Sequence, residues 1–434
     1  ARQRRALIEE LSQDGFVLKD ASAKFKNDKE VVLVAVKQDG RVLEFASEKL
    51  KRDKEVVLAA VKQNGSALWD ASAKLKNDKE VVLAAVAQDG WDALWHASAK
   101  LKNDKEVVLA AVKQNGDAIQ LVLKKFNDNK EVVLAAVKQN GDVLQYVSDK
   151  LKNDKEVVLA AVAQYGDALE HASVELQNDN DVVLAAVAQD GLVLEHVSEE
   201  FKNDKEVVLA AVKQNGLALQ DASAKLKNDK DVVLAAVAQD GLVLEHVSEE
   251  FKNDKEVVLA AVKQNGLALQ DASAELKNDK EVVLVAVKQY GEALGFASVE
   301  LQYDKDVVLA AVAQDGRALG YASAELKNDK EVVLAAVAQN GLALEYASEE
   351  LRKDEKIALL AVSNNNDAKK YINPATYDSI ISQAKINMTS KRSNTLPGEI
   401  GDKKGILRQA LLHHHLKDDE GAGVRKRPVR SATA

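Results

Sequence analysis

The chain repeats one pattern of apolar and polar positions with a period of 25 residues. Each copy has a short polar run, then six mostly apolar residues, and then a Gln-Asp-Gly, Gln-Asn-Gly or Gln-Tyr-Gly triplet. The triplet glycines follow one another at steps of 25 residues, with a single step of 26: Gly15, Gly40, Gly65, Gly90, Gly116, Gly141, Gly166, Gly191, Gly216, Gly241, Gly266, Gly291, Gly316 and Gly341. A fixed period of this length is typical of stacked supersecondary units. The pattern therefore predicts a repeat protein.

The copy around Gly216 predicts two short helices. Asn203 and Glu206 have the spacing of a capping box at the start of the first helix. Residues 207–212 are apolar almost all round, so this helix should be buried between its neighbours. We expect Gly216 to end the helix in a left-handed conformation, which Asn366 also tolerates at the equivalent position of the last copy.

The second helix of this copy is predicted from about Leu217 to Lys225. Its recurring apolar positions fall on one stripe of a helical wheel and are Ala218, Leu219, Ala222 and Leu226. Ser223 lies at the edge of that stripe, where we expect it to hydrogen-bond a carbonyl one turn back. Helices of about 10 residues are marginal alone, so neighbouring copies must stack to bury this stripe.

The pattern divides the chain into four parts. They are an N-terminal cap (1–15), a helical repeat array (16–366), a C-terminal capping segment (367–384) and a basic tail (385–434). Glu9 and Glu10 replace two apolar residues in the first part, as a solvent-facing cap requires. Asn373-Pro374 interrupts the pattern in the third part. The predicted fold is an all-α solenoid of about 14 two-helix repeats, followed by a mostly non-repetitive tail.

Composition supports this assignment. Hydrophobic residues make up 46% of the 434 residues and aromatic residues only 4%, which suits thin, closely stacked layers. The absence of cysteine excludes disulfides and thiolate metal sites, and no apolar run approaches the roughly 18 residues that span a bilayer. We expect a soluble intracellular protein, either in the cytoplasm or inside an organelle after removal of a leader.

Residues 203–227, which read NDKEVVLAAVKQNGLALQDASAKLK, recur with small changes along the chain. This text resembles a tandem helical-repeat family that is known only as a protein domain of unknown function. The resemblance covers about residues 15–365 and implies an all-helical array. It implies no activity, cofactor or functional residue.

One face of the predicted second helix varies between copies, and the three tryptophans lie in adjacent copies. Trp69 and Trp95 occupy the same outward position, and Trp91 adjoins the single inserted residue. Clustered exposed aromatics are typical of interface anchors, so we predict a partner-binding band: Phe45, Trp69, Trp91, Trp95, Leu121 and Tyr146. Two alternatives are neutral drift of a free surface and a rotated helix that buries the indoles. For a second band, packing between adjacent helices is favoured: Phe296, Tyr321 and Tyr346.

No catalytic, cofactor or metal site is predicted. Four histidines recur at one position of the repeat, about a helix diameter apart, which is too far to share a metal ion: His96, His171, His196 and His246. The consecutive His413, His414 and His415 favour a polar helix surface over a weak metal site. The Asp-Lys-Glu clusters open each first helix, where helix capping explains them.

The tail differs in charge from the rest of the chain. The last 50 residues carry a net charge of +6 and the first 384 a net charge of −15. Residues 405–416 could form an amphipathic docking helix, and a short basic run follows. The candidate binding residues of the tail are Ile406, Leu407, Leu411, Arg425, Lys426 and Arg427. The alternatives are a solvated tail and a weak anchor to anionic lipid or nucleic acid.

These observations favour a non-enzymatic scaffold, adaptor or structural subunit that binds other proteins within a large multi-subunit assembly. One alternative is a nucleic-acid-binding repeat protein, which the acidic body argues against because phosphate binding needs a basic track. Another is a peripheral membrane linker that uses the basic tail. An enzyme is disfavoured because no copy carries a unique polar constellation.

Overall fold

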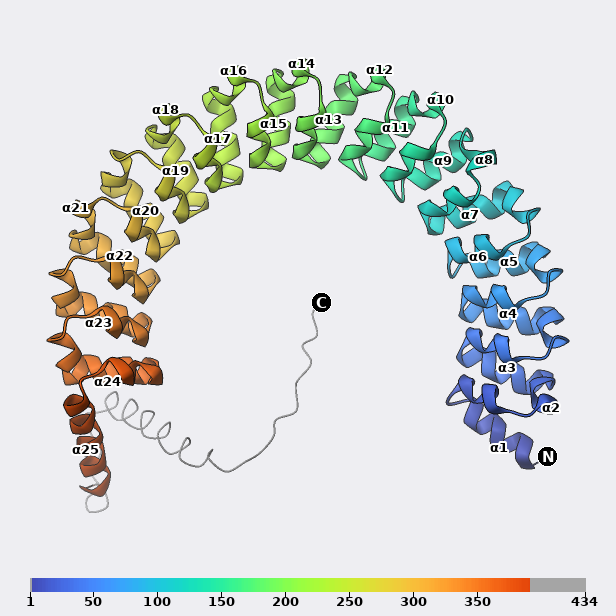
Figure 1. The fold of residues 1–434 in the computed structure, drawn as a ribbon, viewed down its shortest axis with the longest axis horizontal. Helices are drawn as coiled ribbons and strands as arrows, with labels where there is room; N and C mark the ends of the chain where they lie inside the picture. The colour runs from blue at the N-terminus through green and yellow to red at the C-terminus, as the bar shows by residue number, and fades with distance from the viewer. Residues whose placement is uncertain (1, 391–434) are drawn as a thin grey trace, which may run out of the picture. The chain divides into compact units, whose positions relative to one another are not determined.

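A computed structural model describes residues 2–390 of the chain, with side chains through residue 382. All regular elements within residues 2–390 are helical, without a strand. The chain divides into two compact units, unit 1 (residues 1–226) and unit 2 (from residue 227 onward), and each is a stack of 25-residue repeats (Figure 1). The all-α repeat fold predicted from the sequence is confirmed.

Each repeat contains three helical segments and not the two that were predicted. We name them the A helix, the B segment and the C segment; around Gly216 they are α15 (Lys205–Gln214), η11 (Gly216–Asp221) and α16 (Ala224–Lys227). The predicted second helix is split because Ala222 has an extended backbone, with φ −67° and ψ 158°. This bend lets the Ser223 amide donate to the Lys202 carbonyl of the preceding repeat, at 2.8 Å.

The elements of unit 1 follow this order after the N-terminal helix α1 (Arg2–Leu11). The A helices are α3 (Lys29–Gln38), α4 (Lys54–Gln63), α5 (Lys79–Val86), α7 (Lys105–Gln114), α9 (Lys130–Val137), α11 (Lys155–Val162), α13 (Asn180–Gln189) and α15. The B segments are η1 (Gly15–Asp20), η2 (Gly40–Phe45), η4 (Gly65–Asp70), α6 (Gly90–His96), η7 (Gly116–Leu121), η8 (Gly141–Tyr146), η9 (Gly166–His171), η10 (Gly191–His196) and η11. The C segments are α2 (Ala23–Lys26), η3 (Leu50–Arg52), η5 (Leu75–Asn77), η6 (Leu101–Asn103), α8 (Leu123–Phe126), α10 (Asp149–Lys152), α12 (Val174–Gln177), α14 (Glu199–Lys202) and α16.

Unit 2 repeats the same order. Its A helices are α17 (Lys230–Gln239), α19 (Lys255–Gln264), α20 (Lys280–Gln289), α22 (Lys305–Gln314), α23 (Lys330–Gln339) and α24 (Glu355–Asn364). Its B segments are η12 (Gly241–His246), η13 (Gly266–Asp271), η15 (Gly291–Phe296), η16 (Gly316–Tyr321), η18 (Gly341–Tyr346) and η20 (Asn366–Tyr371). Its C segments are α18 (Glu249–Lys252), η14 (Leu276–Asn278), α21 (Val299–Gln302), η17 (Leu326–Asn328) and η19 (Leu351–Lys353), and α25 (Pro374–Ser390) follows the last B segment.

Three layers make up each unit. Successive A helices pack against one another, successive B segments do the same, and each A helix also contacts the B segments of its own and the preceding repeat. The C segments contact the following A helix and lie along one edge, as α10, α12 and α14 show in unit 1 (Figure 1). The apolar core therefore lies between the A and B layers.

The A helices are buried on one side and partly open on the other. In α15, Val207, Val208, Ala211 and Val212 are buried, whereas Leu209 and Ala210 remain half-exposed. The expectation that this helix is surrounded on all sides is therefore wrong. The apolar stripe of the predicted second helix is buried as expected, although it is divided between the B and C segments.

An aspartate one residue after the predicted cap begins each typical A helix. The Asp204 carboxylate accepts hydrogen bonds from the amides of Glu206 and Val207, at 2.8 and 3.1 Å. The capping box predicted from Asn203 to Glu206 is therefore wrong by one residue. Asn203 follows the C segment α14 and accepts a hydrogen bond from the Ser223 hydroxyl, at 2.8 Å. Ser223 consequently bonds the preceding repeat and not a carbonyl one turn back.

The triplet glycines do not end helices in the left-handed conformation. Gly216 is the first residue of η11, and none of the corresponding glycines of the neighbouring repeats has a left-handed φ. Glycine is required by close packing, because a Cβ at these positions would lie under 3.0 Å from the carbonyl oxygen of an alanine in the next A helix. Asn366 is tolerated in the last B segment because the next element, α25, does not repeat the A-helix sequence.

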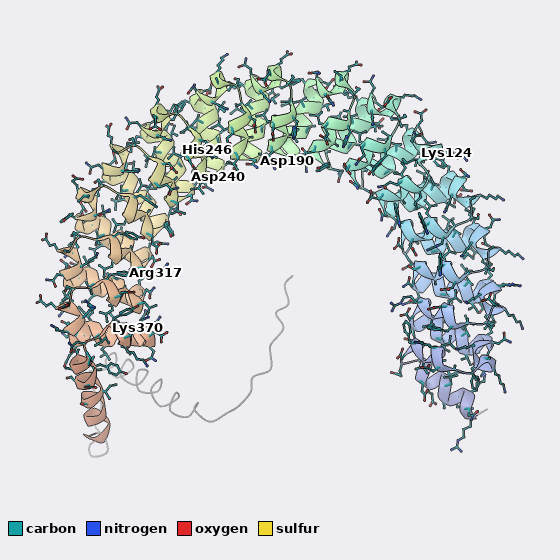
Figure 2. All side chains as sticks on the ribbon, in the orientation of Figure 1. Lys124, Asp190, Asp240, His246, Arg317 and Lys370 are labelled. Atoms are coloured by element: carbon teal, nitrogen blue, oxygen red, sulfur yellow. The ribbon has the colours of Figure 1, made fainter. Side chains whose placement is uncertain are left out.

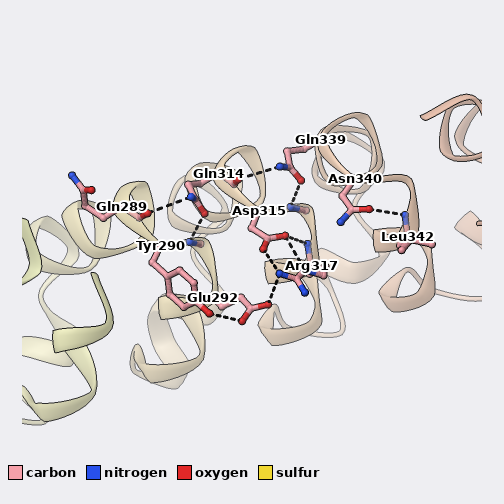
Figure 3. Close-up of polar contacts among 11 residues, drawn as sticks. Gln289, Tyr290, Glu292, Gln314, Asp315, Arg317, Gln339, Asn340 and Leu342 are labelled. Carbon is pink, nitrogen blue, oxygen red and sulfur yellow. Dashed lines mark hydrogen bonds and ion pairs between the residues drawn. The ribbon is translucent and has the colours of Figure 1, made fainter. Parts of the chain in front are cut away.

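A ladder of glutamines joins successive repeats. The Gly291 amide donates to the Gln314 Oε1 at 2.6 Å, and the Gln314 Nε2 donates to the Gln289 carbonyl at 3.2 Å. Figure 3 shows how Gln339 repeats this arrangement one step further. Each glutamine therefore binds two main-chain groups of the preceding repeat, which explains why the triplet begins with Gln.

A second ladder consists of ion pairs. The first lysine of an A helix reaches the capping aspartate and the first-turn acid of the next A helix: Lys54 lies 2.7 Å from Asp78 and 2.8 Å from Glu80. Equivalent pairs begin at Lys29, Lys79, Lys130 and Lys155 in unit 1 and at Lys230, Lys255, Lys280 and Lys305 in unit 2. The Asp-Lys-Glu motif therefore supplies contacts between successive A helices.

The two ends of the described array depart from the repeat. In α1, Glu9 and Glu10 are exposed as expected for a cap, and Arg4 takes the ladder position by contacting Asp28 and Glu30. At the other end, α25 packs on α24, and Asn373 accepts a hydrogen bond from the Ala375 amide at 3.0 Å. The Asn373-Pro374 break in the pattern therefore begins a new helix.

Candidate protein-binding surface

Two tryptophans occupy a position of the B segment that is polar or glycine in the other repeats. The residue after the buried Leu or Ile of the B segment is polar or glycine in twelve repeats: Lys19, Glu44, Gln120, Gln145, Glu170, Glu195, Gln220, Glu245, Gln270, Gly295, Gly320 and Glu345. In the third and fourth repeats it is Trp69 and Trp95, which are 62% and 55% exposed. The frame therefore presents two indoles to solvent from equivalent positions of consecutive repeats.

The inserted residue changes the B segment that carries Trp95. This segment, α6, is a seven-residue α-helix, whereas the other B segments are six-residue 3-10 helices. Its cap Asp89 accepts from the Asp92 amide three residues on, at 2.9 Å, whereas Asn64 of the preceding repeat accepts from Ser66. Trp91 is half-buried, but Trp95 stays exposed. Burial of the indole by rotation, the alternative raised from the sequence, does not hold for Trp95.

The exposed indoles are held by their neighbours. The Trp69 ring meets the His96 ring of the next repeat edge to face, with centroids 4.6 Å apart and an interplanar angle of 68°. The Lys76 ammonium lies 5.3 Å from the Trp69 ring centroid, and the Lys102 ammonium lies 5.7 Å from that of Trp95. Such cation–π contacts contribute about 0.5–1 kcal/mol at exposed sites. We name these five residues the Trp69–Trp95 surface.

Charge and burial set the protonation of this surface. The His96 Nε2 lies 3.3 Å from an Asp92 carboxylate oxygen, but burial outweighs this contact and lowers the pKa of His96 below its ordinary value of 6.5. Burial also lowers the pKa of Lys102. His96 is consequently neutral at pH 7, and the two lysines supply the positive charge.

The other members of the predicted band lie elsewhere on the B segments. Phe45 is half-buried and contacts Phe16 of the preceding repeat, with ring centroids 6.2 Å apart. Leu121 is half-buried and Tyr146 is exposed. Phe45, Leu121 and Tyr146 come one residue later in their segments than Trp69 does. The sequence did not identify His96 and Lys76 as members of the surface. His96 contacts Trp69 from the next repeat, and Lys76 reaches the Trp69 ring from the C segment, beyond the bend that follows the B segment.

The second aromatic band includes packing between repeats, as the sequence favoured. A Cβ on Gly295 would lie 2.8 Å from the Tyr321 ring, and one on Gly320 would lie 3.2 Å from the Tyr346 ring. Each tyrosine ring therefore packs on a glycine of the preceding repeat. Phe296 is half-buried in η15.

A further polar cluster joins two B segments of unit 2. Arg317 on η16 (Figure 2) pairs with Asp315 at 2.9 Å and with Glu292 at 3.4 Å, and the Tyr290 hydroxyl donates to Glu292 at 2.8 Å (Figure 3). The hydrogen bond to Glu292 raises the pKa of Tyr290. No group of three or more His, Asp or Glu side chains suited to a metal ion occurs among the described residues.

An open groove of about 720 Å³ is lined by residues of α17 and α19. Its apolar lining comes from Leu234, Ala238, Leu259 and Ala260, and its polar lining includes Lys255 and Lys263. These residue types recur at the same positions of most repeats. The groove therefore contains nothing that distinguishes one repeat from the next.

The six candidate residues of the tail lie outside the described residues, as do His413, His414 and His415: Ile406, Leu407, Leu411, Arg425, Lys426 and Arg427. Within the described part of the chain, no helix has the length and apolar character needed to cross a membrane.

Comparison with protein families gives tandem matches to a domain of unknown function (DUF4116). The matched segments are residues 11–51, 53–99, 78–127, 129–177, 179–227, 205–252, 229–277, 254–302, 304–352 and 329–374. Comparisons with curated proteins and with solved structures found no match. Each matched segment holds about two of the repeats described above, and together the segments cover nearly the whole array. The chain therefore belongs to the DUF4116 family of tandem helical repeats.

Proposed function

We propose that this protein is a non-catalytic scaffold that binds other proteins through the Trp69–Trp95 surface, as one subunit of a larger assembly. The observation that carries the proposal is the exposure of two indoles at a position that is polar or glycine in the other twelve repeats. Exposed aromatics of this kind become interface anchors when a partner covers them, because tryptophan buries a large apolar area on binding.

The rest of the repeat supports a scaffold role. The glutamine and lysine ladders satisfy the recurring polar groups within the array, so the frame is held independently of any partner. A frame of this kind can present a few variable residues in fixed positions. The acidic charge of the first 384 residues supports a protein partner over a nucleic acid.

The test replaces both tryptophans with a residue that already occurs at this position of the B segment in other repeats. Glutamine occupies the same position in four other repeats: Gln120, Gln145, Gln220 and Gln270. We expect Trp69→Gln with Trp95→Gln to leave the helical content unchanged, to lower the melting temperature only slightly through the lost ring contacts, and to abolish specific capture of partner proteins from an extract of the native source. Tyr303→Ala is the matched control, since it removes a 57% exposed aromatic that directly follows the C segment α21 of unit 2. Equal capture by the double variant and by the wild type contradicts the proposal.

A further inference from the structure

At one exposed position of the C segments, the first six repeats carry lysine, whereas the seventh and eighth repeats and all five C segments of unit 2 carry glutamate. This position is the residue directly before the Leu or Phe of the C segment. In six consecutive repeats of unit 1 it is an exposed lysine: Lys24, Lys49, Lys74, Lys100, Lys125 and Lys150. In unit 2 it is an exposed glutamate: Glu250, Glu275, Glu300, Glu325 and Glu350. The third and fourth repeats, which carry the two indoles, therefore lie among the repeats whose C segments carry lysine at this position.

Four lysines belong to the C segments that flank the exposed indoles. Lys76 and Lys102 lie over the rings, and Lys74 and Lys100 come two residues earlier at the start of η5 and η6. Two nearby carboxylates oppose this charge. Asp92 lies 3.3 Å from the His96 Nε2. Asp70 lies near Lys51, Lys76, Glu44 and Glu48, and burial is the main cause that raises its pKa. The four lysines therefore outnumber these two carboxylates around the indoles.

We propose that the Trp69–Trp95 surface binds an acidic polypeptide segment that also carries apolar side chains. This inference rests on the proposed function and names the chemistry of the partner. Apolar side chains of the segment cover the indoles, and its carboxylates meet Lys74, Lys76, Lys100 and Lys102. Charge complementarity of this kind speeds encounter and selects the partner.

The width of the apolar area favours a peptide over a membrane. On either side of the two tryptophans, the equivalent position is Glu44 in one repeat and Gln120 in the other. The apolar contact is thus two repeats wide, a span that an extended segment of about 10 residues covers. A nucleic acid would need open ring faces for base stacking, and an ammonium group already lies over one face of each indole.

Intrinsic fluorescence can test this inference, because the three tryptophans of the chain all lie in the third and fourth repeats. The probes are two synthetic peptides of about 10 residues without Trp or Tyr, one alternating Glu and Leu and the other alternating Lys and Leu. We expect the Glu–Leu peptide to change the emission of the full-length protein saturably, and the Lys–Leu peptide to leave it unchanged. Added salt should weaken the response.

Two double variants separate charge from apolar contact. Lys74→Glu with Lys100→Glu introduces the residue found at this position in unit 2, and Lys76→Gln with Lys102→Gln removes the ammonium groups above the rings. We expect each to weaken binding of the Glu–Leu peptide by about tenfold. The melting curve should stay unchanged for the first variant and fall slightly for the second, which loses the two cation–π contacts. Lys24→Glu with Lys150→Glu is the control, because it makes the same change away from the indoles; its binding should stay within about twofold of the wild type.

Three results overturn the inference. They are equal responses to both peptides, unchanged binding by the two lysine variants, and a stronger response to anionic phospholipid vesicles or polyuridylate than to the Glu–Leu peptide. If Trp69→Gln with Trp95→Gln still abolishes partner capture, any of these results rejects the acidic segment as the partner but not the proposed function. If that double variant captures partners as the wild type does, the proposed function itself is rejected.

Discussion

Gly65 lies directly against the main-chain carbonyl of Ala85 in the next repeat, and a Cβ on Gly65 would stand 2.6 Å from that oxygen. The neighbouring amide of Asp89 would lie 3.2 Å away. Both groups belong to the backbone, the carbonyl near the end of α5 and the amide at the cap of α6, so neither can move aside as a flexible side chain would. The glycine of the triplet therefore sets how closely a B segment approaches the next A helix.

Gly65→Ala should destabilise the array although its backbone conformation suits alanine. Forcing one methyl group into a closely packed contact costs about 1–3 kcal/mol, and here the contact recurs at every step of the stack. We expect the urea midpoint of unfolding to fall, as measured by circular dichroism at 222 nm. Asn366→Ala is the control, because the equivalent position at the end of the array is followed by α25; its midpoint should stay close to that of the wild type.

The role of glycine illustrates what the sequence could predict. The period, the core positions and the all-helical class follow from local pattern, because Val207, Leu219 and their counterparts repeat at helical spacing. The reason for the glycine does not follow, because it depends on a carbonyl that is 20 residues away in sequence. The same limit applies to Asn203, whose partner Ser223 belongs to the next repeat.

The ion-pair ladder predicts loss of stability at both extremes of pH. The hydrogen bond from Lys54 holds the pKa of Asp78 below its ordinary 3.8. The contribution of this carboxylate to folding stability is therefore complete above pH 3.8 and is lost as pH falls through the pKa of Asp78 in the folded state. The partners Asp78 and Glu80 raise the pKa of Lys54 above 10.5. Its contribution is complete below pH 10.5 and is lost as pH rises past the folded-state value.

Lys54→Met should therefore reduce the acid sensitivity of the array, with a small effect at neutral pH because exposed ion pairs contribute little. Melting temperatures measured from pH 2 to pH 7, with and without added salt, check this. Identical acid profiles for the variant and the wild type would show that the ladder does not control acid unfolding.

The candidate surface was only partly visible in the sequence. Trp69 and Trp95 could be identified because tryptophan departs from the residue types of the other repeats at that position. The pairing of Trp69 with His96 could not be identified, because it depends on how consecutive B segments stack. The half-buried state of Trp91 follows from the conversion of one 3-10 helix into α6, which the inserted residue alone did not reveal.

The pKa of His96 predicts a pH-dependent tryptophan signal. Burial lowers this pKa below 6.5, so the neutral ring stabilises the fold fully above pH 6.5 and that contribution is lost as pH falls through the folded-state value. Protonation changes the electrostatic surroundings of the Trp69 ring. We expect a fluorescence transition with a midpoint below pH 6.5 that is absent in His96→Gln, and a transition that persists in this variant would assign the signal to another group.

Asn180 occupies the ladder position of α13 where most A helices carry lysine, and the next capping residues are Asp204 and Glu206. A lysine at position 180 would stand at the usual ladder spacing from these two carboxylates, as Lys155 does from Asp179 and Asp181. Asn180→Lys should therefore raise the melting temperature by about 1–3 °C at low salt, and by less at high salt. Asn180→Gln lengthens the side chain without adding charge and should give no rise. An equal rise in both variants, or one that salt does not reduce, would assign the effect to packing and leave the ladder without a measurable role at this step.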